Sequence, residues 1–182
     1  MDAKAELLAD LETIRDCVPL SQGNHYRFMW DFVLRHGTWY EPRAYPPDLP
    51  PGAVKQCFGN SIMLSLVKGY RYVEGFAVMP PPFSPMPIHH AWNADAFGAL
   101  IDSTWRNGGV AYLGVEFSAE RADDATWNGD ASVLDDFRRG HPLFKEPWQG
   151  EDWSRRWPEN ERVTLLRSGK IKLAHDRMVL QL

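Results

Sequence analysis

The sequence contains few cysteines and no long apolar run. Among its 182 residues there are two cysteines, Cys17 and Cys57, too few for a disulfide framework or a recognisable zinc pattern. No apolar stretch approaches the roughly 18 residues that a membrane span needs, and the first residues lack the apolar core of a signal peptide. These absences predict a cytoplasmic protein without membrane association, in which both thiols are reduced and free.

Signals for nucleic-acid and nucleotide binding are also missing. The formal net charge is −4, which provides no excess of basic side chains for a phosphate backbone. The chain contains neither a G-x-G-x-x-G pattern nor a P-loop, the glycine-rich motifs that hold dinucleotides and nucleotide phosphates. We therefore expect no nucleic-acid partner and no cofactor.

Length and composition predict one globular α+β domain over residues 1–182. Hydrophobic residues make up 44% of the chain, and the eight tryptophans are more typical of a filled core than of a groove. A chain of this size buries about 70% of its unfolded surface. Within the domain we distinguish a helical part with a loop over 1–52, a core over 53–117 and a C-terminal elaboration over 118–182.

Apolar spacing predicts the secondary structure. Cys17 falls in the first helix, where we expect it to be a small buried residue. Ser21 is the expected N-cap of the second helix, and Gly37 its end. The predicted helices are 5–18, 21–36, 57–68, 131–139 and 159–167, and the predicted strands are 38–40, 70–78, 88–94, 99–104, 110–117 and 171–182.

Cys57 follows a proline-containing loop and falls in the first turn of the helix predicted over 57–68. Unpaired backbone amides and the helix dipole favour an anion at that position, and a neighbouring imidazolium favours it further. The Cys57 amide and the Gln56 side chain are the expected donors to an oxyanion at this site. Gly69 suits the end of the helix, because glycine readily takes the left-handed conformation found there.

His90 and Asp102 lie on two strands that a short turn at Asp95–Gly98 connects into a hairpin. If the pairing is centred on Ala96, residue 90 faces residue 102. Side chains alternate with period two, so His90, Trp92, Leu100 and Asp102 share one sheet face, with opposed Cβ atoms roughly 4.5–5.5 Å apart. His89 then points to the other face, and the spacing predicts a hydrogen bond between His90 and Asp102.

Four motifs in residues 57–105 resemble the transglutaminase-like branch of the papain-like cysteine enzymes. They are Cys57 at a helix start, Tyr-Val-x-Gly at 72–75, His-Ala-Trp at 90–92 and Asp-x-Thr at 102–104. The resemblance implies a papain-like core, in which a helix bearing the cysteine packs on an antiparallel sheet bearing the histidine and aspartate. It also implies that Cys57 is the nucleophile, His90 the general base and acid, and Asp102 the residue that orients His90.

The expected activity is acyl transfer from an amide, peptide or isopeptide bond of a protein or peptide substrate. Water as acceptor makes a hydrolase and an amine makes a transglutaminase; the alternative is a non-enzymatic interaction module with the same fold. Candidate cleft residues are Glu74, Trp92 and Trp105, although Glu74 also fits an ion pair at a sheet edge. A metal site is disfavoured, because His89 and His90 point to opposite faces of their strand.

Overall fold

The computed structural model describes residues 2–83, 86–128, 132–151 and 153, and the backbone of two C-terminal strands. The chain begins with two helices, and four of the strands follow the third helix consecutively. The order of the elements is α1 (Ala3–Cys17), α2 (Met29–His36), β1 (Thr38–Tyr40), α3 (Cys57–Lys68), β2 (Arg71–Val78), β3 (Ile88–Ala94), β4 (Leu100–Ile101), β5 (Ala111–Phe117), α4 (Ala119–Asn128), the 3-10 turns η1 (Phe137–Arg139) and η2 (Pro142–Phe144), β6 (Ile171–Ala174) and β7 (Arg177–Leu180).

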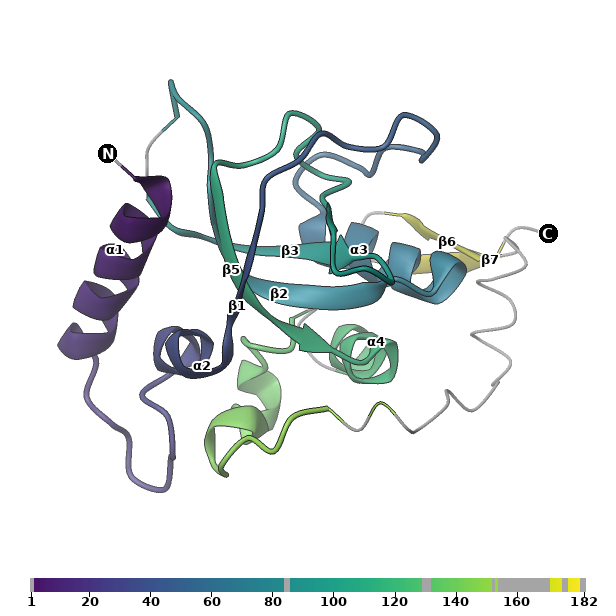
Figure 1. Ribbon diagram of the computed structural model, residues 1–182. Coiled ribbons are helices and arrows are strands. Elements are labelled where there is room, and N and C mark those ends of the chain that lie inside the picture. Colours follow the sequence, from purple (N-terminus) through teal and green to yellow (C-terminus); the bar gives the residue numbers. More distant parts are fainter. Residues whose placement is uncertain are drawn as a thin grey trace.

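A five-stranded sheet with the order β1-β5-β2-β3-β4 forms the centre of the molecule (Figure 1). Every pair of neighbouring strands is antiparallel. The predicted α+β class is confirmed. The single strand predicted over 171–182 is instead a hairpin, in which β6 pairs with β7. No helix in the described part of the chain is long and apolar enough to cross a membrane.

One face of the sheet carries the main hydrophobic core. Alternate residues of β2 and β5 point into it, among them Tyr72, Phe76 and Leu113, as the predicted alternation of β2 requires. Buried residues of α1, α2, α3 and α4 pack on the same face, for example Leu11, Phe32, Ile62 and Ala122. This arrangement places α3 against β3 and β2, and so fixes where its first residue, Cys57, lies relative to the sheet.

Loops, rather than helices, cover the opposite face. A second buried cluster there contains Trp92, Leu100 and Tyr112, with Trp105 packed against it. The loop before α3 and the connection from β4 to β5 lie together near the top of the view in Figure 1. The Gly52 amide donates to the Ser103 carbonyl at 2.9 Å, so the segment that leads to Cys57 is attached to the segment that carries Asp102.

Two predictions for the N-terminal region are wrong. Cys17 is exposed at the end of α1, because the buried side of this helix is formed by Leu7 and Leu11. The second helix begins at Met29 and not after Ser21, since Phe28 has a φ of 144° and interrupts the helical backbone. Gly37 ends α2 as expected, and β1 has the predicted limits of 38–40.

The C-terminal part differs from the helical pattern predicted for it. In the described part of this range, residues 132–139, only the 3-10 turn Phe137–Arg139 forms, and Phe137 is 58% exposed instead of facing the core. The amides of Val133 and Leu134 donate to the Glu74 carboxylate, which holds this backbone away from a helical path. A helix, α4, forms over Ala119–Asn128, where the sequence analysis expects none, and the helix predicted over 159–167 lies outside the described residues.

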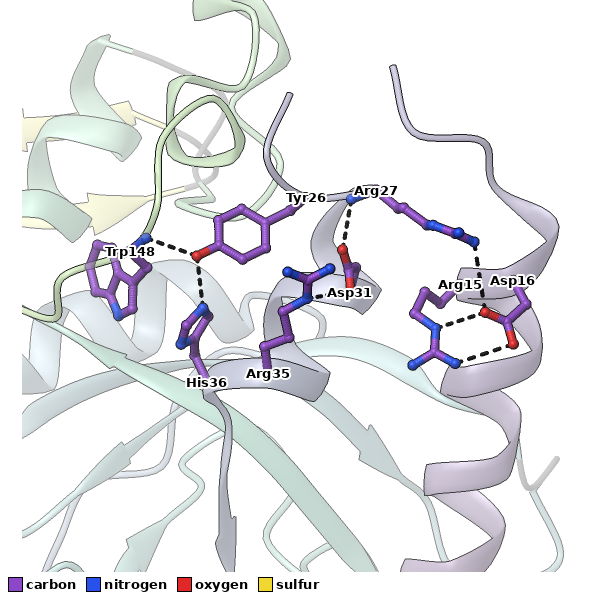
Figure 2. A network of polar contacts seen from close by, with 8 residues as sticks. All are labelled: Arg15, Asp16, Tyr26, Arg27, Asp31, Arg35, His36 and Trp148. Carbon is purple, nitrogen blue, oxygen red and sulfur yellow. Dashed lines mark hydrogen bonds and ion pairs between the residues drawn. The ribbon is translucent and has the colours of Figure 1, made fainter. Parts of the chain in front are cut away.

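The aromatic segment after η2 folds over the core beside α2 (Figure 2). The Tyr26 hydroxyl accepts a hydrogen bond from the Trp148 amide at 2.8 Å and lies 2.8 Å from His36 Nε2. The Phe144 side chain is fully buried, and the Trp148 ring packs edge-on against Phe117. The side of the sheet opposite the loops is thereby closed by residues from both ends of the chain.

We expect the Gly75→Ala substitution to destabilise the protein strongly. A Cβ atom at position 75 would lie 2.2 Å from the Leu113 carbonyl oxygen and 2.4 Å from Gly114 Cα, both in the backbone of β5. Because a paired strand cannot move aside without breaking its ladder, we expect a loss of about 3 kcal/mol, or a melting temperature lower by about 6–12 °C. Thermal unfolding followed by circular dichroism measures this shift.

Gly98→Ala is the matched control. A Cβ atom at Gly98 would meet nothing within 4 Å, and the substitution adds only the strain of a φ of +79°. This costs about 1 kcal/mol. Equal shifts in the two variants would contradict the close approach of β2 and β5.

Candidate active site

Cys57 is the first residue of α3, as the sequence predicts. Gln56 precedes it as the N-cap and uses a non-helical backbone conformation without a side-chain cap. The Asn60 side chain bonds to both backbone groups of Ala53 and to the Thr104 hydroxyl, at 2.8–3.0 Å. These bonds fix the loop before the helix, so that Cys57 is held in a turn whose free amides stabilise a negative charge.

His90 lies on a part of β3 that has a strand on only one side. The described part of β4 pairs with Asn93 and Ala94 alone, so β3 is open toward α3 around His90. The first turn of α3 fills this position. The Cys57 thiol is close enough to the His90 side chain to raise the pKa of the imidazole, and Phe58 packs edge-on against His89 with ring centroids 5.0 Å apart. The structure therefore places the predicted thiol near the predicted imidazole.

Asp102 holds the other side of the His90 ring. His90 Nε2 lies 2.8 Å from Asp102 Oδ2, and both side chains are buried. The backbone amides of Thr104 and Trp105 each donate to Asp102 Oδ1 at 3.0 Å. Because Nε2 is bonded to the carboxylate, Nδ1 is the ring nitrogen left to interact with the thiol. The two backbone amides hold the Asp102 carboxylate in its position.

The predicted hairpin register is wrong by one residue at its centre. Asn93 pairs with Ile101 and Ala94 with Leu100, so the turn is centred on Phe97 and not on Ala96. Asp95 stabilises the longer turn by accepting hydrogen bonds from the amides of Phe97 and Ala99. The shift changes the residue opposite His90 by two positions, so Asp102 stays on the same sheet face as His90. Asp102 therefore reaches His90 from a diagonal position instead of from directly opposite.

The electrostatic surroundings of His90 favour its protonated form. Burial opposes the charge, but the hydrogen bond to Asp102 and the interaction with Cys57 outweigh it and raise the pKa of His90 to about 9. The Trp105 ring stacks on the imidazole, with centroids 4.0 Å apart and planes inclined by 14°. A positive imidazolium under an aromatic face is a favourable pair, and the indole also shields the bond to Asp102 from water.

Tyr112 is a member of this network that the sequence did not indicate. Its hydroxyl donates to Asp102 Oδ2 at 2.9 Å, the same oxygen that His90 contacts. It lies on β5, which is separated from β3 by β2 in the sheet. A tyrosine in an ordinary strand pattern gives no local sign of such a bond, so no signal in the sequence could have identified it.

A second carboxylate–imidazole pair occupies the opposite face of β3. His89 Nε2 lies 2.8 Å from Glu74 Oε1, as the alternation of His89 and His90 implies. Glu74 also accepts hydrogen bonds from the Tyr72 and Ser132 hydroxyls and from two amides of the 132–134 segment. Burial would raise the pKa of Glu74, but these donors, led by His89, lower it.

Two of the three predicted cleft residues do not reach a surface. Glu74 and Trp92 are both 0% exposed, which corrects their assignment to a substrate cleft. Glu74 is also not at a sheet edge, since β2 is the central strand. Trp105 is half-buried over His90, and the Gln56 side chain lies next to Cys57 without a hydrogen bond of its own among the described residues. These two remain candidates for substrate contact.

Comparison with protein-family models, with curated proteins and with solved structures finds no match to the chain. The resemblance to transglutaminase-like enzymes therefore depends on the four motifs in residues 57–105 alone. Among the residues that the structure describes, no group of three or more histidine, cysteine or acidic side chains is placed to hold a metal ion.

Proposed function

We propose that the protein is a thiol-dependent acyl-transfer enzyme with Cys57 as nucleophile, His90 as acid and base, and Asp102 as the residue that orients His90. The observation that carries the proposal is the placement of the Cys57 thiol near His90, whose ring is in turn hydrogen-bonded to Asp102. A nucleophile, a base within hydrogen-bond reach and a third group that orients the base are the requirements for covalent acyl catalysis.

The proposed reaction begins with the Cys57 thiolate and the His90 imidazolium. The thiolate sulfur attacks the substrate carbonyl carbon, and the developing oxyanion is stabilised by the Cys57 amide and the Gln56 side chain. As the C–N bond breaks, His90 gives its proton to the leaving amine, and a thioester remains on Cys57. Water then attacks the thioester while His90 takes a proton from it, which releases the acid and regenerates the thiolate–imidazolium pair.

We infer a protein or peptide substrate and hydrolysis as the net reaction. An amine that reached the thioester before water would produce transglutamination by the same steps, with the amine supplying the proton that His90 accepts. The mixed fold with a cysteine-bearing helix on an antiparallel sheet supports a papain-like core of the transglutaminase-like type. A cytoplasmic location belongs to the proposal, because it keeps a thiol nucleophile reduced.

The pH dependence of Cys57 alkylation by iodoacetamide tests the proposal. Cys17 is exposed and would also react, so the measurement uses the Cys17→Ser background and peptide mass spectrometry. We expect labelling at pH 6 about 100-fold faster than that of an ordinary thiol, since only about 0.3% of an ordinary thiol is ionised there. A second, smaller change in rate should appear near the His90 pKa of about 9, because the thiolate loses its imidazolium partner there and remains ionised.

An unactivated thiol would give the opposite result. Slow labelling that rises only above pH 8, or labelling only after unfolding, would overturn the enzyme proposal. The fold would then serve as a non-enzymatic interaction module in which the three side chains form a buried structural cluster. Free cysteine, measured in the same buffers, supplies the reference profile for both outcomes.

A further inference from the structure

The Tyr112 hydroxyl has a fixed direction of hydrogen bonding. The Gly109 amide donates to the hydroxyl oxygen at 2.5 Å, and the hydroxyl lies 2.9 Å from Asp102 Oδ2. A carboxylate cannot donate, so the single proton of the phenol points to Asp102. Burial, and then the negative charge of Asp102, raise the pKa of Tyr112, which keeps this proton in place. Tyr112 is thus a permanent donor to the carboxylate.

The two donors to Asp102 Oδ2 compete for the same oxygen. His90 Nε2 contacts it at 2.8 Å and Tyr112 at 2.9 Å, while the other oxygen accepts two backbone amides. A hydrogen bond that stabilises the carboxylate charge also lowers the tendency of that oxygen to attract a further proton. Tyr112 therefore weakens the attraction between Asp102 and the His90 proton without breaking it.

We propose that Tyr112 is a positioning residue that tunes His90 as a general acid by sharing the Asp102 carboxylate with it. The proposal rests on the proposed function. A general acid is most effective when its pKa lies near the working pH, and an imidazolium held too tightly by a carboxylate gives up its proton slowly. Tyr112 offsets this hold and keeps His90 able to protonate the leaving amine.

Few other groups around His90 could adjust its pKa in this way. Asp102 is hydrogen-bonded to the His90 ring, and the Cys57 thiol also raises its pKa. The aromatic contacts of the ring are the side chains of Trp92, Trp105 and Tyr112. Glu74 and His89 lie on the opposite face of the sheet. Of these three aromatic side chains, Tyr112 is the one that donates a hydrogen bond to Asp102 through its side chain.

Titration of the His90 ring by NMR, in wild type and Tyr112→Phe, tests the proposal in the Cys17→Ser background. Loss of the phenol proton should raise the titration midpoint by about one pH unit, since a hydrogen bond to a charged group has an effect of that size. The upper limb of the Cys57 alkylation profile should move by the same amount. A midpoint that stays in place or moves down would overturn the proposal.

Tyr40→Phe is the matched control. Tyr40 is also buried on this sheet face and donates to a carboxylate, but its partner is Glu116, at 2.9 Å. Its loss should leave the His90 midpoint unchanged, whereas an equal shift in both variants would contradict a specific role for Tyr112. The control separates the hydrogen bond to Asp102 from the general effect of removing a buried hydroxyl.

A second variant keeps the test valid if Tyr112→Phe does not fold. Site-specific 3-fluorotyrosine at position 112 retains the shape and makes the phenol a stronger donor, so the His90 midpoint should move down. An upward or absent shift would contradict the proposal. The titration of His90 needs no catalytic turnover, so failure of the enzyme proposal, seen as an ordinary Cys57 alkylation profile, is distinguishable from failure of the Tyr112 proposal.

Discussion

His90→Gln should reduce the rate of Cys57 alkylation at pH 6 by about 100-fold or more, to that of an ordinary thiol. The imidazolium lies close enough to the thiol for the two groups to interact, and its charge would offset that of the thiolate. Glutamine has a similar volume and donates through its amide to Asp102, but it carries no charge. The thiolate would then depend on the helix terminus alone, which contributes typically 0.3–1 kcal/mol.

His89→Gln is the control, because His89 is the adjacent residue and also pairs with a carboxylate. Its ring lies on the other face of β3, bonded to Glu74, so the alkylation profile of Cys57 should stay close to that of wild type. Circular dichroism establishes that both variants are folded. If the His89 variant loses the fast labelling and the His90 variant keeps it, the assignment of the two histidines is wrong.

Local patterns in the sequence were sufficient to place the thiol and the imidazole. The apolar spacing and Gly69 predicted α3 with its observed limits, Cys57–Lys68, and the alternation predicted β3 as Ile88–Ala94. Both signals depend on neighbouring residues only, and period two alone determines that His90 and His89 face opposite sides. The predicted contact between His90 and Asp102 is observed although the predicted register is wrong, because a shift of two residues leaves Asp102 on the same sheet face.

Interactions between distant segments could not be predicted in this way. β5 follows β4 in the chain but pairs with β2 and β1, and this crossing is what brings Tyr112 to Asp102. The irregular path of residues 132–134 depends on hydrogen bonds to Glu74, nearly sixty residues earlier. The local sequence of that segment favours a helix, but its hydrogen bonds to the buried Glu74 carboxylate determine the backbone path instead. No local pattern reveals these bonds.

Glu74→Leu should be the most destabilising single substitution in the core. Glu74 is 0% exposed and accepts hydrogen bonds from two hydroxyls, one imidazole and two backbone amides at 2.5–2.9 Å. Leucine would leave all five donors buried without an acceptor. Removing one partner of a buried ion pair costs about 3–5 kcal/mol, and each unsatisfied donor adds about 1–3 kcal/mol.

The expected loss of more than about 4 kcal/mol is comparable with the total stability of many domains, about 5–15 kcal/mol. Urea unfolding, followed by tryptophan fluorescence, measures it as a much lower midpoint or as a chain unfolded in buffer.

Glu116→Leu is the control: Glu116 also lies in the sheet and bonds to Arg71 and Tyr40, but its side chain is 22% exposed. A loss of about 1–2 kcal/mol is expected there, because water replaces part of what is removed. Similar losses in both variants would contradict a special role for the Glu74 cluster.

The charge of Glu74 also predicts how stability depends on pH. Burial alone would raise its pKa, but the bonds from His89 and the other donors lower it below the ordinary value of 4.5. The folded state therefore binds the Glu74 proton less tightly than the unfolded chain does. The resulting stabilisation is fully present above the ordinary value and is lost as the pH falls through the lowered one.

In Glu74→Gln this contribution is missing at every pH, so the difference in unfolding free energy from wild type should be constant above about pH 5 and narrow below pH 4. A difference that stays constant down to pH 3 would mean that Glu74 has the same pKa in the folded protein and in the unfolded chain. If Glu74 were protonated in the folded protein, the stability of wild type would instead fall relative to that of the variant as the pH rises above the ordinary carboxyl value.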